Sequence, residues 1–206
     1  MSLNPLYTVE NQLKEVKNDI EQIKSALSEV RINNIDNVLK SYPHELSGGM
    51  KQRIIIAMAL ISKAELILAD EPTTALDVSV SNSILNLLLD LKIKGKTIIL
   101  ITHDLSIASN YSDTVNIMYL GNIVESANTI ELFKNPLHPY TKALLGAIPN
   151  TKGTRLSNIK GQIPSIKENI NGCKFHPRCD MAIDKCALYA PKLNCTNHKC
   201  ACLLVK

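Results

Sequence analysis

Glycine is scarce in this chain, with eight residues among 206, and the motif Gly-x-x-x-x-Gly-Lys-Ser/Thr occurs nowhere in it. In that motif, backbone amides and a lysine hold the phosphates of a bound nucleotide. The nearest approach, Gly95-Lys96-Thr97, lacks the upstream glycine and leads into an apolar stretch, so it predicts a turn. The sequence therefore contains no phosphate loop of this type.

Long apolar runs are also absent. The longest, Ile54–Ile61, has eight residues, whereas a helix needs about 20 to cross a membrane. No secretory signal is recognisable, so we expect any contact with a membrane to come through partner subunits. With 45% hydrophobic residues, the chain is long enough for one core and an appendage.

The chain has no tryptophan, and aromatic residues are few in its C-terminal part. From Thr151 on, ten Lys and Arg stand against three Asp and Glu, and the only aromatic residues are Phe175 and Tyr189. Binding of single-stranded nucleic acid requires aromatic platforms on which bases stack. We therefore expect no nucleic-acid partner, and interpret the basic tail as a docking surface for a protein or as a solvated face.

The first informative motif that is present reads Leu46-Ser47-Gly48-Gly49-Met50. Ser47 is a good helix N-cap, and the two glycines allow backbone to approach a ligand closely, ahead of a helix predicted over 50–61. Because the N-terminus of a helix has unpaired amides, it attracts anions such as phosphate. A plain loop and cap is the alternative interpretation.

Two apolar segments are followed by polar residues. Leu66–Ala69 leads into Asp70 and Glu71, and Ile98–Ile101 leads toward His103. Such runs predict strands buried on both faces of a parallel sheet, at whose carboxyl edge ligands bind. Asp70 could hold Mg²⁺, directly or through water, and Glu71 could orient an attacking water molecule. The alternative is a solvated acidic turn and a structural histidine.

Taken in order, these segments resemble the ATP-binding cassette (ABC) family of transport ATPases. The resemblance covers the signature loop at 46–50, the Walker B strand with Asp70 and Glu71, and the switch histidine, His103. It implies an α/β fold of P-loop NTPase type that binds ATP and Mg²⁺. In the family, the matching histidine contacts the terminal phosphate, and the resemblance assigns His103 that role.

The resemblance also implies a dimer. Thr74-Ala75-Leu76-Asp77 is similar to the D-loop, which communicates across two such domains, and the alternative for Asp77 is the N-cap of a helix over 78–91. In the family, each nucleotide lies between the phosphate loop and Walker B of one subunit and the signature loop of its partner. Ser47-Gly48-Gly49 would therefore complete the nucleotide-binding site of a partner.

The missing phosphate loop predicts that the chain is a fragment that begins inside the ATPase domain, with roughly the first third of that domain absent. As given, it would neither bind ATP tightly nor hydrolyse it. Loss of strands from a sheet exposes edges and apolar faces, so we expect a dimer or a higher oligomer.

Apolar residues among the first forty positions alternate spacings of four and three, which marks one face of a helix. They are Val9, Leu13, Val16, Ile20, Ile23, Leu27 and Val30. A coiled coil would show the same stripe, but Asn18-Asp19 with Gln22 offers a break and a capping box, so we predict two packed helices. By resemblance, this block is the helical subdomain that meets the membrane-spanning subunits.

Cysteine is absent from the first 172 residues, and six cysteines follow within thirty residues. They are Cys173, Cys179, Cys186, Cys195, Cys200 and Cys202. Structural disulfides are disfavoured in a cytosolic protein, so the clustering indicates a metal. The paired Cys-x-x-Cys knuckles of a zinc ribbon are missing, whereas an iron-sulfur cluster requires four thiolates and tolerates varied spacing.

Three further segments resemble the oligopeptide and dipeptide branch of the family, specifically its D-type subunit: Tyr42–Glu45, Asn135–Thr141 and Gly172–Cys179. In that branch, four tail cysteines can hold a four-iron, four-sulfur cluster; zinc is the alternative metal. The ligand pattern maps onto Cys173, Cys179, Cys186 and Cys202. The fourth position rests on the spacing His198-x-x-x-Cys, and the additional Cys195 and Cys200 leave it open.

The sequence thus predicts an α/β protein with a partial ABC ATPase core, a helical subdomain (1–45), the C-terminal part of the core (46–134) and a Cys-rich peptide-transporter region (135–206). We expect the ATP-hydrolysing subunit of a peptide importer at the cytoplasmic face of the membrane. Its partners would be a second ATPase subunit, two membrane-spanning permease subunits and, through the complex, an extracellular or periplasmic binding protein. The alternatives are a nickel importer, a non-transport ATPase of the same fold, and a regulatory metal-sensing tail.

Overall fold

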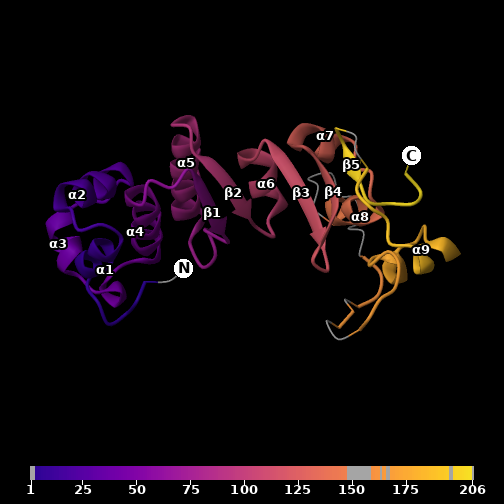
Figure 1. The fold of residues 1–206 in the computed structure, drawn as a ribbon, viewed down its shortest axis with the longest axis horizontal. Helices are drawn as coiled ribbons and strands as arrows, with labels where there is room; N and C mark the ends of the chain where they lie inside the picture. Colours follow the sequence, from indigo (N-terminus) through magenta and orange to yellow (C-terminus); the bar gives the residue numbers. More distant parts are fainter. Residues whose placement is uncertain (1–2, 148–158, 163, 166–167, 195–196, 206) are drawn as a thin grey trace. The chain divides into compact units, whose positions relative to one another are not determined.

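The computed structural model describes all residues except 1–2, 148–158, 163, 166–167, 195–196 and 206 (Figure 1). Contacts divide the chain into an N-terminal unit, residues 1–103, and a C-terminal unit, residues 104–206. Each unit has its own hydrophobic core. This division differs from the regions predicted at 1–45, 46–134 and 135–206, which rest on motifs rather than on packing and remain a prediction.

The N-terminal unit begins with short helices: α1 (Val9–Val16), α2 (Ile20–Glu29), α3 (Ile35–Lys40) and the 3-10 helix η1 (Pro43–Glu45). The predicted break between the first two helices is confirmed. Asp19 caps α2, because its carboxylate accepts hydrogen bonds from the backbone N–H groups of Glu21 and Gln22. The Gln22 side chain binds the Asp19 carboxylate rather than its backbone N–H, so the cap lacks the reciprocal half of the predicted box.

The predicted apolar stripe is buried except where α1 gives way to α2. The buried members are Val9, Leu13, Ile23, Leu27 and Val30, which share one core with α4 (Gly48–Ile61). Val16 and Ile20 are more than a third exposed. They flank the break, where the chain leaves the helical path that would have kept them on the buried face.

The second half of this unit forms a parallel β–α–β arrangement of β1 (Leu66–Asp70), α5 (Val78–Ile93) and β2 (Thr97–Ile101). In Figure 1, α1 to α4 gather to one side of these strands and α5 lies beside them. Gly95, with φ +88°, ends α5 in the predicted turn. The two strands therefore point the same way and end at the same edge.

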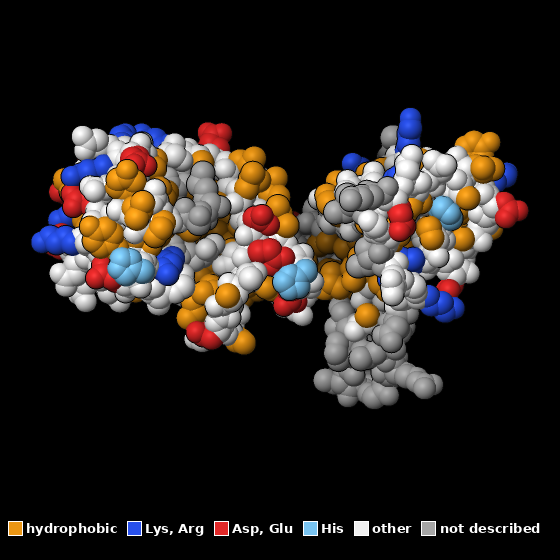
Figure 2. Space-filling model, turned by 90° about the horizontal axis from the view of Figure 1, so that it is seen from below, with side chains coloured by type: hydrophobic (Ala, Val, Ile, Leu, Met, Phe, Trp, Pro, Cys, Tyr) orange, Lys and Arg blue, Asp and Glu red, His pale blue; other side chains and the backbone are white. Residues whose placement is uncertain are grey.

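The prediction that the strands are buried on both faces is wrong. Ile67 and Ala69 lie in the core with α4 and α5, but Leu68 is 66% exposed, and Ile99 and Ile101 about half exposed. Within the described residues this sheet consists of β1 and β2, and in β1 the side chains that alternate with the buried ones stay exposed. Figure 2 shows hydrophobic side chains, in orange, exposed among charged ones on one face of the protein. The oligomer expected from an uncovered sheet stays a prediction.

The C-terminal unit contains the remaining elements: α6 (Leu105–Tyr111), β3 (Thr114–Tyr119), β4 (Asn122–Asn128), α7 (Thr129–Lys134), α8 (Pro139–Gly146), η2 (His176–Arg178), α9 (Asp184–Leu188) and β5 (Lys199–Cys200). The strands form an antiparallel sheet in the order β3-β4-β5. Leu120 and Gly121, both with positive φ, make the tight hairpin between β3 and β4. No helix in the described part of the chain is long and apolar enough to cross a membrane.

Candidate functional site

The carboxyl ends of β1 and β2 bring together side chains that the sequence singled out. The strand register aligns Asp70 with Ile101, and the Glu71 N–H continues the ladder by donating to the Ile101 carbonyl oxygen (2.9 Å). The Glu71 carboxylate accepts a hydrogen bond from the backbone N–H of His103 (3.2 Å) and lies 2.7 Å from His103 Nδ1. Asp70, Glu71 and His103 thus lie at one edge of the sheet, as predicted, whereas their catalytic roles stay predictions.

Glu71 is held in a strained conformation at this edge. Its φ is +46°, in the left-handed region that residues other than glycine seldom adopt. The Thr74 hydroxyl donates to the second carboxylate oxygen (3.0 Å), so both oxygens of Glu71 have partners. A strained backbone conformation persists only where contacts with the surrounding structure hold it in place, and such residues cluster at functional sites.

His103 lowers the pKa of Glu71. Hydrogen bonding from His103 holds the pKa of Glu71 below its ordinary value, and the Thr74 hydroxyl adds to the effect against the opposing influence of burial. Because the pKa of Glu71 is lower in the folded state, its ionisation stabilises the fold at pH values above the pKa of a glutamate in the unfolded chain. This stabilisation is lost as the pH falls through the folded-state pKa. The carboxylate is therefore charged at neutral pH.

Replacing His103 with alanine should raise the pKa of Glu71 toward its ordinary value, because the principal hydrogen bond to the carboxylate is lost. A carbon-13 NMR titration of the Glu71 carboxyl measures the shift. His44→Ala is the matched control, since His44 stacks on Tyr42 and should leave the titration unchanged. An identical Glu71 titration in the wild type and in His103→Ala would contradict the assignment.

Helix α4 begins at Gly48, two residues before the start predicted from the sequence, and its N-cap is the predicted one. Ser47 is the N-cap, and its hydroxyl accepts from the Met50 N–H (3.3 Å). A Cβ on Gly49 would lie 2.5 Å from Val80 Cγ1, and one on Gly48 would lie 2.8 Å from the Leu76 side chain. Gly49 thus allows close packing against the β-branched Val80, a reason that the sequence motif did not reveal, whereas a Cβ on Gly48 would meet only the flexible end of the Leu76 side chain.

Asp77 caps the neighbouring helix. Its carboxylate accepts from the Val80 N–H (2.9 Å) at the start of α5, which is the alternative role considered for it. The close approach of Gly49 to Val80 brings this cap beside the start of α4. Its D-loop role across a dimer stays a prediction.

In the C-terminal unit, four cysteines line a single pocket. They are Cys173, Cys179, Cys186 and Cys202, the four to which the ligand pattern mapped. Cys200 lies instead on β5, where its N–H donates to Asn194 Oδ1 (3.0 Å), and Cys195 lies outside the described residues. The pocket therefore favours Cys202 over Cys200 as the fourth member of the set.

The cysteine pocket is not arranged around a single metal ion. Among the residues that the structure describes, no group of three or more His, Cys, Asp or Glu side chains is placed to hold one. Burial raises the pKa of the Cys173 and Cys179 thiols, and the neighbouring thiols add to the effect. Without a bound cation, these cysteines are therefore neutral thiols.

Gly172 sets the shape of this pocket. Its φ is +66°, and a Cβ there would lie 2.3 Å from the Cys186 carbonyl oxygen, which accepts from the Cys173 N–H (2.8 Å). Only glycine fits both the backbone conformation and the close approach of the two segments.

Gly172→Ala should lower the free energy of unfolding of the C-terminal unit by about 2–4 kcal/mol, because left-handed strain and a backbone clash add. Urea unfolding measures the loss, and faster labelling of the thiols would show that the pocket has opened. Gly161→Ala is the matched control: its φ is also positive, but its nearest neighbour would be 3.7 Å away, so it should cost about 1 kcal/mol. Equal effects of the two variants would contradict this account.

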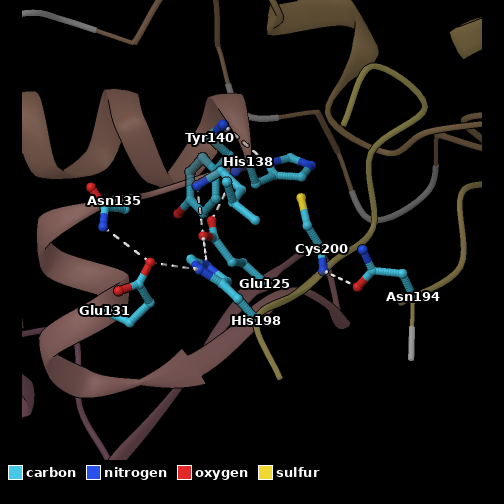
Figure 3. A network of polar contacts seen from close by, with 9 residues as sticks. Glu125, Glu131, Asn135, His138, Tyr140, Asn194, His198 and Cys200 are labelled. Carbon is cyan, nitrogen blue, oxygen red and sulfur yellow. Dashed lines mark hydrogen bonds and ion pairs between the residues drawn. The ribbon is translucent and has the colours of Figure 1, made fainter. Parts of the chain in front are cut away.

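A buried polar network lies beside the pocket (Figure 3). Glu125 on β4 is fully buried, and its carboxylate accepts from the N–H groups of Leu137 (2.7 Å) and His138 (2.9 Å). His198 Nε2 lies 2.6 Å from the same carboxylate. The network thus ties the C-terminal segment to β4 and to the start of α8.

Sequence reasoning did not single out Glu125. The available signal was a carboxylate within the otherwise apolar or small residues 123–127 of a strand. Such a group is buried only when paired and hydrogen-bonded, and its partners lie 12 to 73 positions away in the sequence.

Burial sets the protonation of two other groups here. It lowers the pKa of His138 to about 4, against the opposing effect of Glu125, and raises the pKa of Cys200 to about 12, with Glu125 adding to the rise. His138 is therefore neutral, and Cys200 is a thiol, at physiological pH.

Two protein families match parts of the chain. Residues 1–74 match the family described as ABC transporter, and residues 124–186 match the family described as oligopeptide/dipeptide transporter, C-terminal region. Because the first match begins at residue 1, it does not confirm the prediction that the chain is a fragment.

Proteins named as peptide transport ATP-binding proteins match most of the chain. The chain is 44% identical over 204 residues to the oligopeptide transport ATP-binding protein AppD of Bacillus subtilis, and 42% identical over 205 residues to the dipeptide transport ATP-binding protein DppD of Escherichia coli. The alignments cover 93% and 94% of this chain, but 62% and 63% of those proteins. The chain thus spans somewhat less than two thirds of the length of these relatives.

Solved structures agree on the fold. A dimeric, post-hydrolysis ATP-binding cassette bound to ADP and Pi matches 62% of this chain and 59% of its own, with 27% identity and a TM-score of 0.53. A nucleotide-free cassette from an ABC transporter matches 62% of this chain and 50% of its own, with 28% identity and a TM-score of 0.55. The predicted α/β fold of P-loop NTPase type is thereby confirmed.

Proposed function

The chain belongs to the family of ABC transporter ATP-binding proteins, in its oligopeptide and dipeptide branch, and on that premise we propose that it is the ATP-hydrolysing subunit of a peptide importer. The observation that carries the proposal is the Glu71–His103 pair, which lies where two parallel strands end. Ligands of open α/β sheets bind at that edge.

The residues at this edge have distinct roles in hydrolysis. The Glu71 carboxylate accepts a hydrogen bond from the attacking water and orients it toward the terminal phosphate. His103, whose side chain is 82% exposed, reaches the same phosphate and links it to Glu71. The exposed Asp70 carboxylate offers the oxygen ligand that Mg²⁺ prefers. Bound Mg²⁺ neutralises charge on the phosphates.

The α4 N-terminus serves a second subunit. Ser47, Gly48 and Gly49 present the start of a helix, which favours an anion, and would close the nucleotide site of a partner ATPase subunit. Asp77, beside this helix start, would carry contact across the dimer. Since the sequence holds no phosphate loop, the chain by itself should not hold its own nucleotide.

The working complex would contain more than one kind of subunit. We expect a second ATPase subunit, two membrane-spanning permease subunits and an extracellular or periplasmic binding protein, with this chain at the cytoplasmic face of the membrane. The helices α1 to α3 would transmit movement to the permease subunits.

Co-expression with candidate permease subunits, followed by purification, tests this function. When the complex also contains the second ATPase subunit and the phosphate loop that this chain lacks, its rate of ATP hydrolysis should rise on addition of peptide and binding protein. The isolated chain should neither bind Mg-ATP at micromolar concentration nor hydrolyse it. Stimulation by nickel instead of peptide would assign the cargo to nickel. Co-purification with nucleic acid and not with membrane subunits would point to a non-transport ATPase.

For the tail, we propose that Cys173, Cys179, Cys186 and Cys202 hold a four-iron, four-sulfur cluster. Four thiolates are the ligand set that such a cluster needs, and these four line one pocket. A cluster keeps its thiolates farther apart than a single ion does, because its inorganic core stands between them, which is compatible with the absence of a single-ion site among the described residues. Anaerobic purification should yield about four iron and four sulfide per chain, and zinc alone would assign the pocket to zinc.

A further inference from the structure

The loop that joins β1 to α5 holds Thr74 next to Glu71. The Thr74 N–H donates to the Glu71 carbonyl oxygen (3.2 Å), which closes one turn. The Leu76 N–H donates to the Thr73 carbonyl oxygen (3.2 Å), which closes a second turn. Glu71 and Ala75 both have positive φ, +46° and +62°. Hydrogen bonds thus fix the loop backbone on both sides of Thr74.

The hydroxyl of Thr74 bonds to a carboxylate, whereas a threonine in a turn ordinarily bonds to nearby main-chain groups. It donates to Glu71 Oε2 (3.0 Å). The Thr74 side chain is exposed, so packing in the core does not account for its position. Because a β-branched side chain has few χ1 rotamers, the contact is stiff. The loop and this side chain together fix the position of Oε2.

The contacts of Glu71 leave one of its two carboxylate oxygens able to accept a further hydrogen bond. An ionised carboxylate accepts about two hydrogen bonds on each oxygen and donates none, so His103 Nδ1, 2.7 Å from Oε1, is the donor. The His103 backbone N–H also donates to Oε1 (3.2 Å), which fills that oxygen. Within the described residues, Oε2 accepts from the Thr74 hydroxyl alone. A water molecule can therefore donate to Oε2.

We infer that Thr74 is a positioning residue for ATP hydrolysis, whose hydroxyl holds Glu71 Oε2 where this oxygen accepts a hydrogen bond from the attacking water. The inference rests on the role proposed above for Glu71. His103 and Thr74 share the carboxylate, with His103 on Oε1 and Thr74 on Oε2. After the larger effect of His103, the Thr74 hydroxyl also lowers the pKa of Glu71, because it favours the charged form.

Two substitutions separate the hydroxyl of Thr74 from the shape of its side chain. Valine keeps the branched shape without the hydroxyl, and serine keeps the hydroxyl. In a carbon-13 NMR titration of the chain, Thr74→Val should raise the pKa of Glu71, and Thr74→Ser should leave it close to the wild-type value. Thr73→Val, in the same loop, is the matched control and should not change the titration. Identical titrations of the wild type and Thr74→Val would overturn the inference.

Activity is measured in a transporter whose ATPase subunit carries these residues together with a phosphate loop. Thr74→Val should lower kcat for ATP hydrolysis about tenfold, the factor that corresponds to one hydrogen bond, with KM for ATP unchanged. Since the carboxylate is the active form of Glu71, the loss of activity at acid pH should move to higher pH. Thr74→Ser should restore both the rate and the pH profile. A lower rate with an unshifted profile and no rescue by serine would mean that Thr74 only stabilises the loop.

Glu71→Gln in the same transporter shows which proposal fails. A wild-type rate and pH profile in Thr74→Val, together with an inactive Glu71→Gln, would overturn the role of Thr74 and leave the role of Glu71 standing. Full activity in Glu71→Gln would overturn the proposed role of Glu71, and the role of Thr74 with it.

Discussion

In a transporter whose ATPase subunit carries these residues together with a phosphate loop, Glu71→Gln should reduce ATP hydrolysis by about 10²–10⁴-fold, the range that a positioned acid-base group contributes. Glutamine keeps the size of the side chain but lacks the negative charge that polarises the attacking water. Nucleotide binding should remain, because the proposed binding contacts are made by other residues. Phosphate release measures the rate, and a filter-binding assay with labelled ATP measures the binding.

The matched control for this variant is Glu29→Gln. Glu29 forms an ion pair with Lys94 on the surface of the same unit (2.7 Å) and has no part in the proposed site, so its loss should leave the rate within about twofold, as for most exposed ion pairs. Loss of activity that is equal in the two variants would mean that charge or folding, rather than water activation, explains the effect. Full activity in Glu71→Gln would remove Glu71 from the mechanism.

Glu125→Leu should lower the free energy of unfolding of the C-terminal unit by about 3–5 kcal/mol, the range for breaking a buried charged interaction. The change leaves the N–H groups of Leu137 and His138 buried without this acceptor and removes one partner of His198. Urea unfolding can be followed by tyrosine fluorescence, because the chain has no tryptophan and Tyr119 and Tyr140 pack together near the network.

Glu131→Gln is the control for the buried network. Glu131 lies 3.8 Å from His198 Nδ1, but its side chain is about half exposed, so its replacement should cost less than about 1 kcal/mol. A Glu125→Leu variant that is as stable as the wild type would show that water, rather than the carboxylate, satisfies these buried groups.

Local chemistry made several features predictable from the sequence. Caps at Asp19, Ser47 and Asp77 depend on residues only two or three positions apart, so their residue types are sufficient to locate helix starts. The position of Glu71 and His103 at one edge of the sheet followed from two apolar strands and the rule that parallel strands end at one edge, whereas the contact between them came from the structure.

The cysteine cluster was predictable in part. The resemblance to the peptide-transporter branch implied four ligands, Cys173, Cys179, Cys186 and Cys202, and the additional Cys195 and Cys200 left the fourth position open. The structure separates Cys200 from Cys202, because β5 pairs with β4 and carries Cys200 into the sheet while Cys202 reaches the pocket.

Sequence alone thus determined the family motifs, their order, the capped helices and the edge at which the candidate catalytic residues meet, because each depends on neighbours or on strand direction. Only the tertiary structure decided the exposure of the outer face of β1 and β2, the clash that requires Gly172, and the burial of Glu125 among Leu137, His138 and His198. Burial and hydrogen bonding depend on segments brought together from distant positions, and no pattern within a single segment records which segments those are.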